Sequence, residues 1–478
     1  MGKLKLFIDN ILVYGLGGVI NKLIPLVMLP IVTRLMPDTR YFGINDLQST
    51  VIVFVSSFAI LGLYDALYRM FFEKQEKTYQ KGMCTTALSF VLLSSIIAGI
   101  IIIILKDVIA IEIFQNVEYD YLCYIIAFTI IADCVKSIVQ APTRMQNQRK
   151  VFVITNLITS VFTYSLAIPM IIMGYYVTAL PLAGLFSSVI TDVIFWKLNH
   201  KWFEFRLFSK EYLRELLKIG IPLMPTFVIF WVFNSCDRIM ISNYLGVAAN
   251  GVYAVGAKLA HASQIINTAF GGGWSYFVYS TMNDHNRVEY NSMIFELMSG
   301  VIYFSSICIF VIAEPVYQFF FTGDYVSGYI VSPYLFCAPL MQMLFYVASD
   351  QLLIIKKSWP ITAMLLLGAV VNIALNYILI PYTGIEGAAI STMMGYAISL
   401  LVCIIVVQRE NLIKISAKCM VLTGEFISFV ILWKAFGGDI YMGVASMLIF
   451  STSFAILYRE IVKIFMQKLK ARKELKNV

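Results

Sequence analysis

Residues 14–35 read YGLGGVINKLIPLVMLPIVTRL, the first stretch of the chain that is long enough to cross a bilayer as a helix. It is apolar along most of its length, yet it carries Asn21 and Lys22 near its middle and Arg34 at its end. An ammonium group at the bilayer centre costs about 2.5–3.5 kcal/mol on insertion scales, so Lys22 is not expected to face lipid. We therefore predict a protein-lined aqueous cavity beside Lys22 and an anionic ligand that enters it.

The composition places the whole chain in the same class. Of 478 residues, 60% are hydrophobic and only 13% are charged, and the mean hydropathy is +0.80. Soluble domains carry about 25% charged residues. We predict an all-α polytopic membrane protein, for which the net charge of +8 indicates loops at a membrane surface and no nucleic-acid partner. The eight cysteines form no C-x-x-C pair, which argues against a zinc site or a disulfide framework.

Apolar runs of spanning length recur from end to end, and we count about fourteen of them. Most lysines and arginines fall in the N-terminus, the even-numbered loops and the C-terminal tail. The positive-inside rule then places both termini in the cytoplasm. The predicted spans are residues 12–35, 41–66, 83–105, 119–140, 151–173, 177–198, 216–242, 246–280, 292–313, 330–354, 359–380, 383–407, 416–436 and 440–460.

The two halves of this pattern resemble each other weakly. Residues 41–44 (YFGI) follow the first span, and residues 250–253 (NGVY) follow the seventh after a similar short turn. Parallel repeats of this kind are common in secondary transporters, with the substrate site between the lobes. The domains we predict are an N-terminal six-helix lobe (1–200), an interfacial linker helix (201–218), a C-terminal six-helix lobe (219–408), two additional helices (409–462) and a basic cytoplasmic tail (463–478).

The candidate binding residues are polar groups inside predicted spans. Lys258 and His261 are three residues apart, so they share one helical face in the eighth span. Lys22 and Lys258 lie at comparable depth, about ten residues into their spans. The alternative is that each lysine extends to the membrane surface or pairs with a buried carboxylate. We assign Lys22, Lys258, His261 and Asn21 to an anion site in the cavity.

Carboxylates in the spans raise the question of ion coupling. Asp46 and Asp192 have no partner nearby in sequence, so we treat both as candidate sites for H+ or Na+. Asp133 and Lys136 share a helical face and are interpreted as a structural pair. Residues 271–273 are three consecutive glycines, which predict a bend in the long eighth span.

Several catalytic signatures are missing from the sequence. It contains no G-x-x-x-x-G-K-[ST] phosphate loop, no H-E-x-x-H and no G-x-S-x-G. The predicted outward connections are short and offer little material for a catalytic domain. We therefore predict that the chain is not an enzyme and that it needs no cofactor beyond a coupling ion.

Four motifs follow one another along the chain: residues 29–35 (LPIVTRL) with 41–44 (YFGI), 61–69 (LGLYDALYR), 237–260 (from DR to KLA) and 375–381 (LNYILIP) with 387–389 (GAA). In this order they resemble the bacterial oligosaccharide-lipid flippases of the Wzx type, in the superfamily that also contains the multidrug and toxin extruders. The resemblance covers nearly the whole chain and implies a place in the bacterial cytoplasmic membrane, whereas the arginine-rich first span of the peptidoglycan-precursor flippases is absent.

This resemblance implies two lobes around a central cavity in which cationic side chains hold the pyrophosphate of a polyprenyl-linked oligosaccharide. Lys22 and Lys258 match that expectation. Arg34, Arg69 and Arg238 lie in the motifs near span ends, where the resemblance implies gating or packing as well as substrate contact.

The function we predict is outward translocation, by alternating access, of undecaprenyl-pyrophosphate-linked repeat units for surface polysaccharide synthesis. The partners would be that lipid-linked oligosaccharide, the bilayer and, as a further candidate, the polysaccharide assembly machinery. Two alternatives remain open at this stage: an ion-coupled exporter of small molecules, and a membrane-embedded polysaccharide polymerase or ligase.

Overall fold

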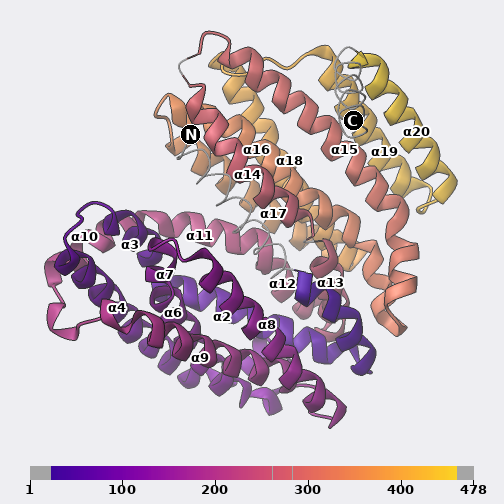
Figure 1. The fold of residues 1–478 in the computed structure, drawn as a ribbon. Helices are drawn as coiled ribbons and strands as arrows, with labels where there is room; N and C mark the ends of the chain where they lie inside the picture. Colours follow the sequence, from indigo (N-terminus) through magenta and orange to yellow (C-terminus); the bar gives the residue numbers. More distant parts are fainter. Residues whose placement is uncertain (1–22, 261, 283, 460–478) are drawn as a thin grey trace, which may run out of the picture.

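The computed structural model describes residues 23–260, 262–282 and 284–459, and all the regular secondary structure in these ranges is helical (Figure 1). The N-terminal bundle begins with a short apolar helix, Leu23–Leu35. Its other helices are α2 (Thr39–Ile60), α3 (Leu63–Phe71), α4 (Lys77–Ile104), α5 (Lys106–Glu112), α6 (Leu122–Val139), α7 (Ala141–Met145), α8 (Arg149–Ile172) and α9 (Ala179–Asn199).

A linker and a second, C-terminal bundle follow. The linker contains two 3-10 turns, His200–Trp202 and Phe205–Leu207, and helix α10 (Lys210–Gly220). The C-terminal bundle consists of α11 (Met224–Trp231), α12 (Asp237–Leu245), α13 (Val247–Ala260), α14 (Ser263–Ser280), α15 (Arg287–Phe320), α16 (Ser332–Ile354), α17 (Trp359–Thr383), α18 (Ile385–Arg409), α19 (Ala417–Ala435) and α20 (Ile440–Leu457).

The all-α polytopic fold class is confirmed, whereas the count of fourteen spans is not. Eleven stretches within the described residues are long and apolar enough to cross a membrane. The first predicted span begins before the described residues. Helix α19 is as apolar as several of the spans, but it carries three charged residues, Lys418, Glu425 and Lys434, and is not among the eleven. The eighth predicted span consists of two helices, α13 and α14.

The three consecutive glycines, residues 271–273, lie inside a single helix. Helix α14 runs through residues 271–273 without interruption, and the change of helix falls between Ala260 and Ser263. Glycine lowers helix stability in solution by about 1 kcal/mol, but it does not by itself break a helix whose backbone hydrogen bonds are sheltered by a membrane. The glycines therefore do not end the helix, and the break within the eighth predicted span precedes them.

The linker packs on the N-terminal bundle. Ser209 caps α10 by accepting hydrogen bonds from the backbone amides of Glu211 and Tyr212. The Tyr212 ring then lies edge-on to Tyr79, with 5.4 Å between ring centroids. Upstream, the backbone amide of Glu204 donates to the Thr85 hydroxyl at 2.9 Å. The linker is thus fixed against α4 before the chain crosses to the second bundle.

Three hydrophobic clusters organise the described residues. One fills the N-terminal bundle around α2, α4 and α6, and a larger one fills the C-terminal bundle around α15 to α18. The third joins the two: Leu29 and Val32 of the first helix pack with Ala254 and Val255 of α13 and with Tyr317 of α15. In Figure 1 the indigo-to-magenta helices and the pink-to-yellow helices form two groups that meet near α2, α12 and α13.

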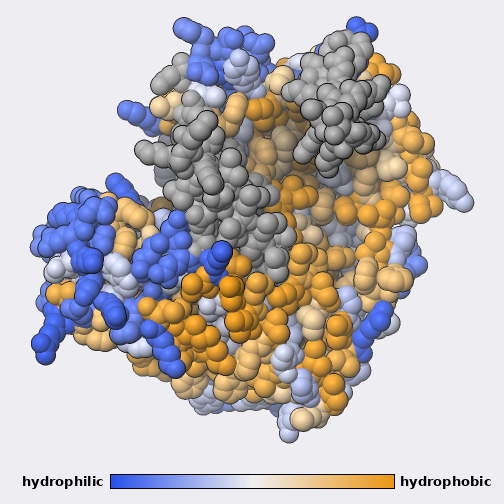
Figure 2. Space-filling model, in the orientation of Figure 1, coloured by the Kyte–Doolittle hydropathy of each residue, from blue (hydrophilic) through white to orange (hydrophobic). Residues whose placement is uncertain are grey.

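The surface of the molecule matches a membrane protein with polar ends. Figure 2 shows hydrophobic side chains over the middle of the molecule and hydrophilic ones gathered at the end that carries α3 and α10. Large apolar side chains are exposed along the spanning helices, among them Ile104 at 73% and Ile172 at 68% of their surface. Such exposure is unfavourable in water, and lipid removes the cost.

Candidate functional site

A charged site lies where the two bundles meet, and a distortion of one helix positions it. Helix α11 passes into α12 through a π-helical turn, Val232–Cys236. A π-turn inserts an extra residue into a helix, and such turns are frequent at functional sites. Asp237 and Arg238 follow directly, and they expose only 2% and 7% of their surface.

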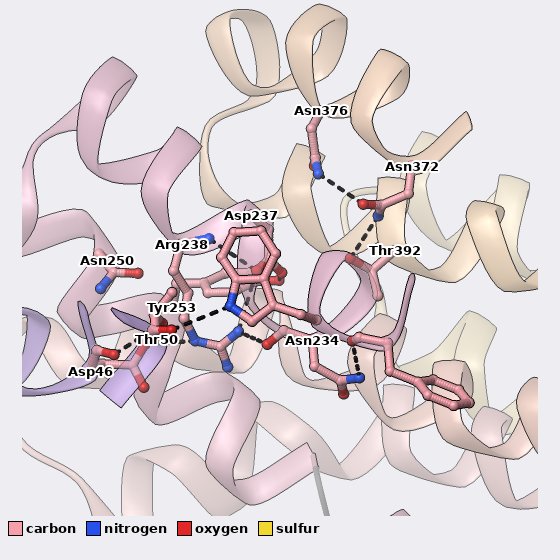
Figure 3. Close-up of polar contacts among 12 residues, drawn as sticks. Asp46, Thr50, Asn234, Asp237, Arg238, Asn250, Tyr253, Asn372, Asn376 and Thr392 are labelled. Atoms are coloured by element: carbon pink, nitrogen blue, oxygen red, sulfur yellow. Dashed lines mark hydrogen bonds and ion pairs between the residues drawn. The ribbon is translucent and has the colours of Figure 1, made fainter. Parts of the chain in front are cut away.

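Arg238 connects the two bundles through buried charges. Its Nε lies 2.6 Å from a carboxylate oxygen of Asp46 on α2, and its Nη1 lies 3.2 Å from Asp237 (Figure 3). It also donates to the carbonyl oxygen of Asn234, and the Tyr253 hydroxyl donates to Asp237. Buried charges are tolerated when they are paired and hydrogen-bonded, which is the case for this cation and both carboxylates.

Neutral polar groups continue the network into the C-terminal bundle. Asn372 donates to the Thr392 hydroxyl at 3.1 Å, and Asn376 donates to Asn372 at 3.3 Å (Figure 3). Asp237, Arg238 and Thr392 line a cavity of about 20 Å³. That is room for about one water molecule. In this conformation, the site is closed to any larger ligand.

Two glycines allow the bundles to touch backbone to backbone. A Cβ added at Gly43 of α2 would lie 2.1 Å from the carbonyl oxygen of Val247, and one at Gly251 of α13 would lie 1.9 Å from that of Thr39. Both distances are far inside van der Waals contact. Asn250 adds a hydrogen bond to the carbonyl oxygen of Gly43 at 3.2 Å. Each glycine thus faces a backbone carbonyl at the start of the other helix, and α2 and α13 pack closely against each other.

Further contacts between the bundles lie at the same end of the molecule. Arg34 donates to the carbonyl oxygen of Phe319 at 3.2 Å, and the Tyr325 hydroxyl donates to that of Asp38 at 3.3 Å. Ser242 donates to the carbonyl oxygen of Ile113 at 3.2 Å. Among the described residues, no hydrogen bond joins the connections 73–76 and 145–148 of the first bundle to 355–358 of the second. Trp231 of α11 also donates to the carbonyl oxygen of Thr50 at 3.2 Å, so the contacts between the bundles extend from that end to the middle of α2.

Of the four predicted anion-binding residues, only Lys258 lies within the described part of the chain. Asn21, Lys22 and His261 lie outside the described residues. Lys258 is exposed in the last turn of α13 and makes no ion pair within the described part of the chain. It follows Gly251 by seven residues and therefore shares the helix face that contacts α2. At 1.5 Å per residue, Lys258 lies roughly 10 Å along α13 from that contact.

The other predicted residues are dispersed. Arg34 lies in the bundle contact described above, and Arg69 is exposed in the last turn of α3. Asp46, considered for ion coupling, is the partner of Arg238. Asp192 of α9 has one buried carboxylate oxygen with no hydrogen-bond partner among the described residues.

The interpretation of Asp133 and Lys136 as a pair agrees with their geometry. Lys136 lies 2.5 Å from Asp133, and the Ser188 hydroxyl of α9 donates to the same carboxylate at 2.7 Å. Sequence reasoning missed Asn234, Tyr253 and Asn250, because nothing in their local sequence indicates partners on other helices.

The fold and its buried inter-bundle charges define a class, the polytopic helical membrane proteins built from two bundles. At 15% identity and a TM-score of 0.64, the chain is similar to "Lipid II flippase MurJ, inward closed conformation", covering 96% of this chain and 99% of that one. It is also similar to an inward-facing multidrug resistance MATE family transporter of the MOP superfamily, at 16% identity and a TM-score of 0.58, covering 82% and 98%.

The sequence family is narrower than the fold. Residues 31–329 match the family described as "Polysaccharide biosynthesis protein", and the chain belongs to that family. A relative from Haemophilus influenzae (strain ATCC 51907 / DSM 11121 / KW20 / Rd), "Lsg locus putative protein 1", is 23% identical over 409 residues, which are 80% of this chain and 96% of the relative.

Together these findings confirm the polysaccharide biosynthesis family and a fold shared with a flippase and a multidrug transporter, in agreement with the resemblance seen in the sequence. The two structural neighbours named above are themselves a flippase and a transporter. The structural likenesses, at such low identity, show the fold alone. The substrate and the direction of transport belong to the proposal that follows.

Proposed function

We propose that the protein translocates undecaprenyl-pyrophosphate-linked oligosaccharide repeat units from the inner to the outer leaflet of a bacterial cytoplasmic membrane. The diphosphate would bind Lys22 and Lys258 between the bundles, with Asn21 and His261 beside them, while the polyprenyl chain stays in lipid. Phosphate oxygens accept strong, charge-assisted hydrogen bonds from lysine ammonium groups. The family match to polysaccharide biosynthesis supports a lipid-linked sugar as the cargo.

One observation carries the proposal: the position of Lys258. It lies on an apolar helix within a membrane protein, yet its side chain is exposed and has no ion pair within the described residues. Its helix face is the one that contacts the N-terminal bundle through Gly251. An intramembrane cation without a carboxylate partner marks a substrate path more often than a packing site.

The pattern of bundle contacts supports access from the cytoplasm in this conformation. The contacts involve Asp38, Ile113, Ser242 and Tyr325, all in or next to connections that the charge pattern places outside the cell. A transporter whose bundles are joined outside and separate inside receives its substrate from the inside. The substrate would then leave once the contacts around Arg238 and Gly251 open.

The test uses the purified chain in proteoliposomes that contain a fluorescent undecaprenyl-pyrophosphate-linked disaccharide. Quenching of the outer leaflet by an impermeant reductant measures how fast the lipid crosses. We expect Lys258→Gln and Lys22→Gln each to slow translocation about tenfold or more, because a charge-assisted contact contributes about 1.5–3 kcal/mol. The matched control is Lys197→Gln, an exposed lysine at the end of α9, which should leave the rate unchanged.

Each alternative function gives a different result in the same vesicles. Wild-type translocation by the double Lys22→Gln, Lys258→Gln variant would refute the anion site. Transport of a small cationic dye without movement of the lipid would favour a small-molecule exporter. Growth of the disaccharide into longer chains would favour a polymerase.

A further inference from the structure

A pocket outside the bundle junction has no role in the proposal above. It has a volume of about 550 Å³ and lies where α15, α16 and α18 meet the turn between α19 and α20. Its lining residues lie near the ends of α15, α16, α18, α19 and α20, next to connections that the charge pattern places on the outer side. The pocket therefore opens at the same end of the molecule as the contacts between the bundles.

One wall of the pocket is aromatic and rigidly held. Trp433 of α19 packs against Phe310 of α15, with 5.8 Å between ring centroids, and Phe310 lies edge-on to Tyr334 at 5.0 Å. A Cβ added at Gly443 would lie 2.6 Å from the indole ring, so this glycine leaves the space that the ring occupies. The indole ring is partly exposed and lines the pocket.

The pocket is also lined by hydrogen-bonding groups in planar side chains. Glu386, at the start of α18, accepts a hydrogen bond from the Tyr334 hydroxyl at 3.0 Å and pairs with Lys434. Glu314 of α15 accepts from Gln318 at 3.0 Å, and both of these side chains are exposed. Carboxylate and amide groups offer free lone pairs and N–H groups beyond the bonds they already make.

We propose that this pocket binds a pyranose sugar. A sugar ring has an apolar face of C–H groups, which would stack on Trp433, and a rim of hydroxyl groups, which would bond Glu314, Gln318 and Glu386. The volume lies within the range of about 300–1,000 Å³ typical of small-molecule sites. The proposal rests on the proposed function for the source of the sugar, the oligosaccharide of the lipid-linked substrate at the outer leaflet.

The same wall residues could in principle hold a lipid amine, and the structure favours a sugar. The Lys434 ammonium already neutralises Glu386, so half of the negative charge in the pocket is used. An ammonium group surrounded by aromatic rings also needs a much smaller space than this pocket provides. A neutral ligand with many hydroxyl groups satisfies the remaining acceptors without adding charge.

The experiment measures sugar binding to the full chain in lipid nanodiscs by saturation-transfer NMR. The probes are the methyl glycosides of glucose, N-acetylglucosamine and glucuronic acid, with phosphoethanolamine as the amine probe. We expect saturation of at least one glycoside, reduced threefold or more in Trp433→Ala and in Glu314→Ala. The exposed Glu314 has no part in the core, so its variant remains informative if Trp433→Ala fails to fold.

The control is Trp359→Ala, which removes a tryptophan that is 76% exposed at the start of α17 and outside the pocket. Its signal should equal that of the wild-type chain. The proposal is overturned if no glycoside is saturated, if the pocket variants match the wild type, or if phosphoethanolamine alone shows pocket-dependent binding.

Failure here is distinguishable from failure of the proposed function. If sugar binding is lost in Trp433→Ala while Lys258→Gln retains it, the pocket and the anion site are separate. Absence of glycoside binding alongside Lys258-dependent translocation would reject only the pocket. Glycoside binding by a chain that moves no lipid would support the pocket and reject the flippase.

Discussion

The carboxylate of Asp46 on α2 lies 2.6 Å from the guanidinium of Arg238 on α12, a buried ion pair between residues 192 positions apart. Asp237 and the ring of Tyr253 contact the same guanidinium from the second bundle, and Asp46 is the carboxylate contributed by the first. Opening the bundles at this end must separate Asp46 from Arg238. The pair therefore links the conformational change to two identifiable charges.

Removing one member of this pair should destabilise the conformation that we describe. Asp46→Ala leaves Arg238 with only Asp237 as a carboxylate partner in a buried site, and breaking a buried pair costs about 3–5 kcal/mol. We expect a lower unfolding midpoint in detergent, measured by the intrinsic tryptophan fluorescence. The double variant Asp46→Leu, Arg238→Met, which buries no unpaired arginine, should recover part of the loss; a double variant as unstable as the sum of the two single variants would contradict this account.

A methyl group at Gly251 should force the bundles apart. The added Cβ would overlap the carbonyl oxygen of Thr39, and this is backbone that cannot rotate away. We expect Gly251→Ala to increase the distance between spin labels placed on α2 and α13, measured by pulsed electron paramagnetic resonance. Gly184→Ala on α9 is the matched control, because a Cβ there meets nothing within 4 Å. Equal distances in both variants would show that this contact does not hold the bundles together.

The orientation of the chain can be tested with single cysteines. Thr322 and Ser358 are exposed in connections at opposite ends of the molecule. The positive-inside rule predicts that an impermeant maleimide added to intact cells labels Thr322→Cys and not Ser358→Cys. The wild-type chain provides the blank, since six of its eight cysteines are buried. The reverse labelling pattern would invert the proposed direction of access.

Asp192 is the carboxylate that remains to be tested for ion coupling. One of its oxygens is buried without a hydrogen bond in the described residues, near the Asp133–Lys136 pair. Binding a proton or a cation stabilises a buried carboxylate oxygen that lacks a hydrogen bond. We expect Asp192→Asn to remove the dependence of translocation on a proton or sodium gradient, whereas the exposed Asp107→Asn should retain it. Unchanged gradient dependence in Asp192→Asn would exclude this residue.

The sequence predicted the helical membrane class because that class depends on composition and on the length of apolar runs. It also indicated Lys258 as a cation within a span, because a charged residue in an apolar segment can be identified without knowing its contacts. It did not show that the eighth span divides into α13 and α14, because the packing of α14 against α16 is a contact between distant segments.

The amino-acid sequence by itself determined that this chain crosses a membrane many times and carries isolated charges along its spans. This is possible because the free energy of transferring a segment into lipid depends mainly on the residues of that segment. Only the tertiary structure decided which of those charges meet. Asp46 and Arg238, or Gly43 and Gly251, come together through the packing of two bundles, and such contacts depend on backbone proximity that no local pattern encodes. The same packing leaves Lys258 exposed beside the junction, where a bound anion would be held.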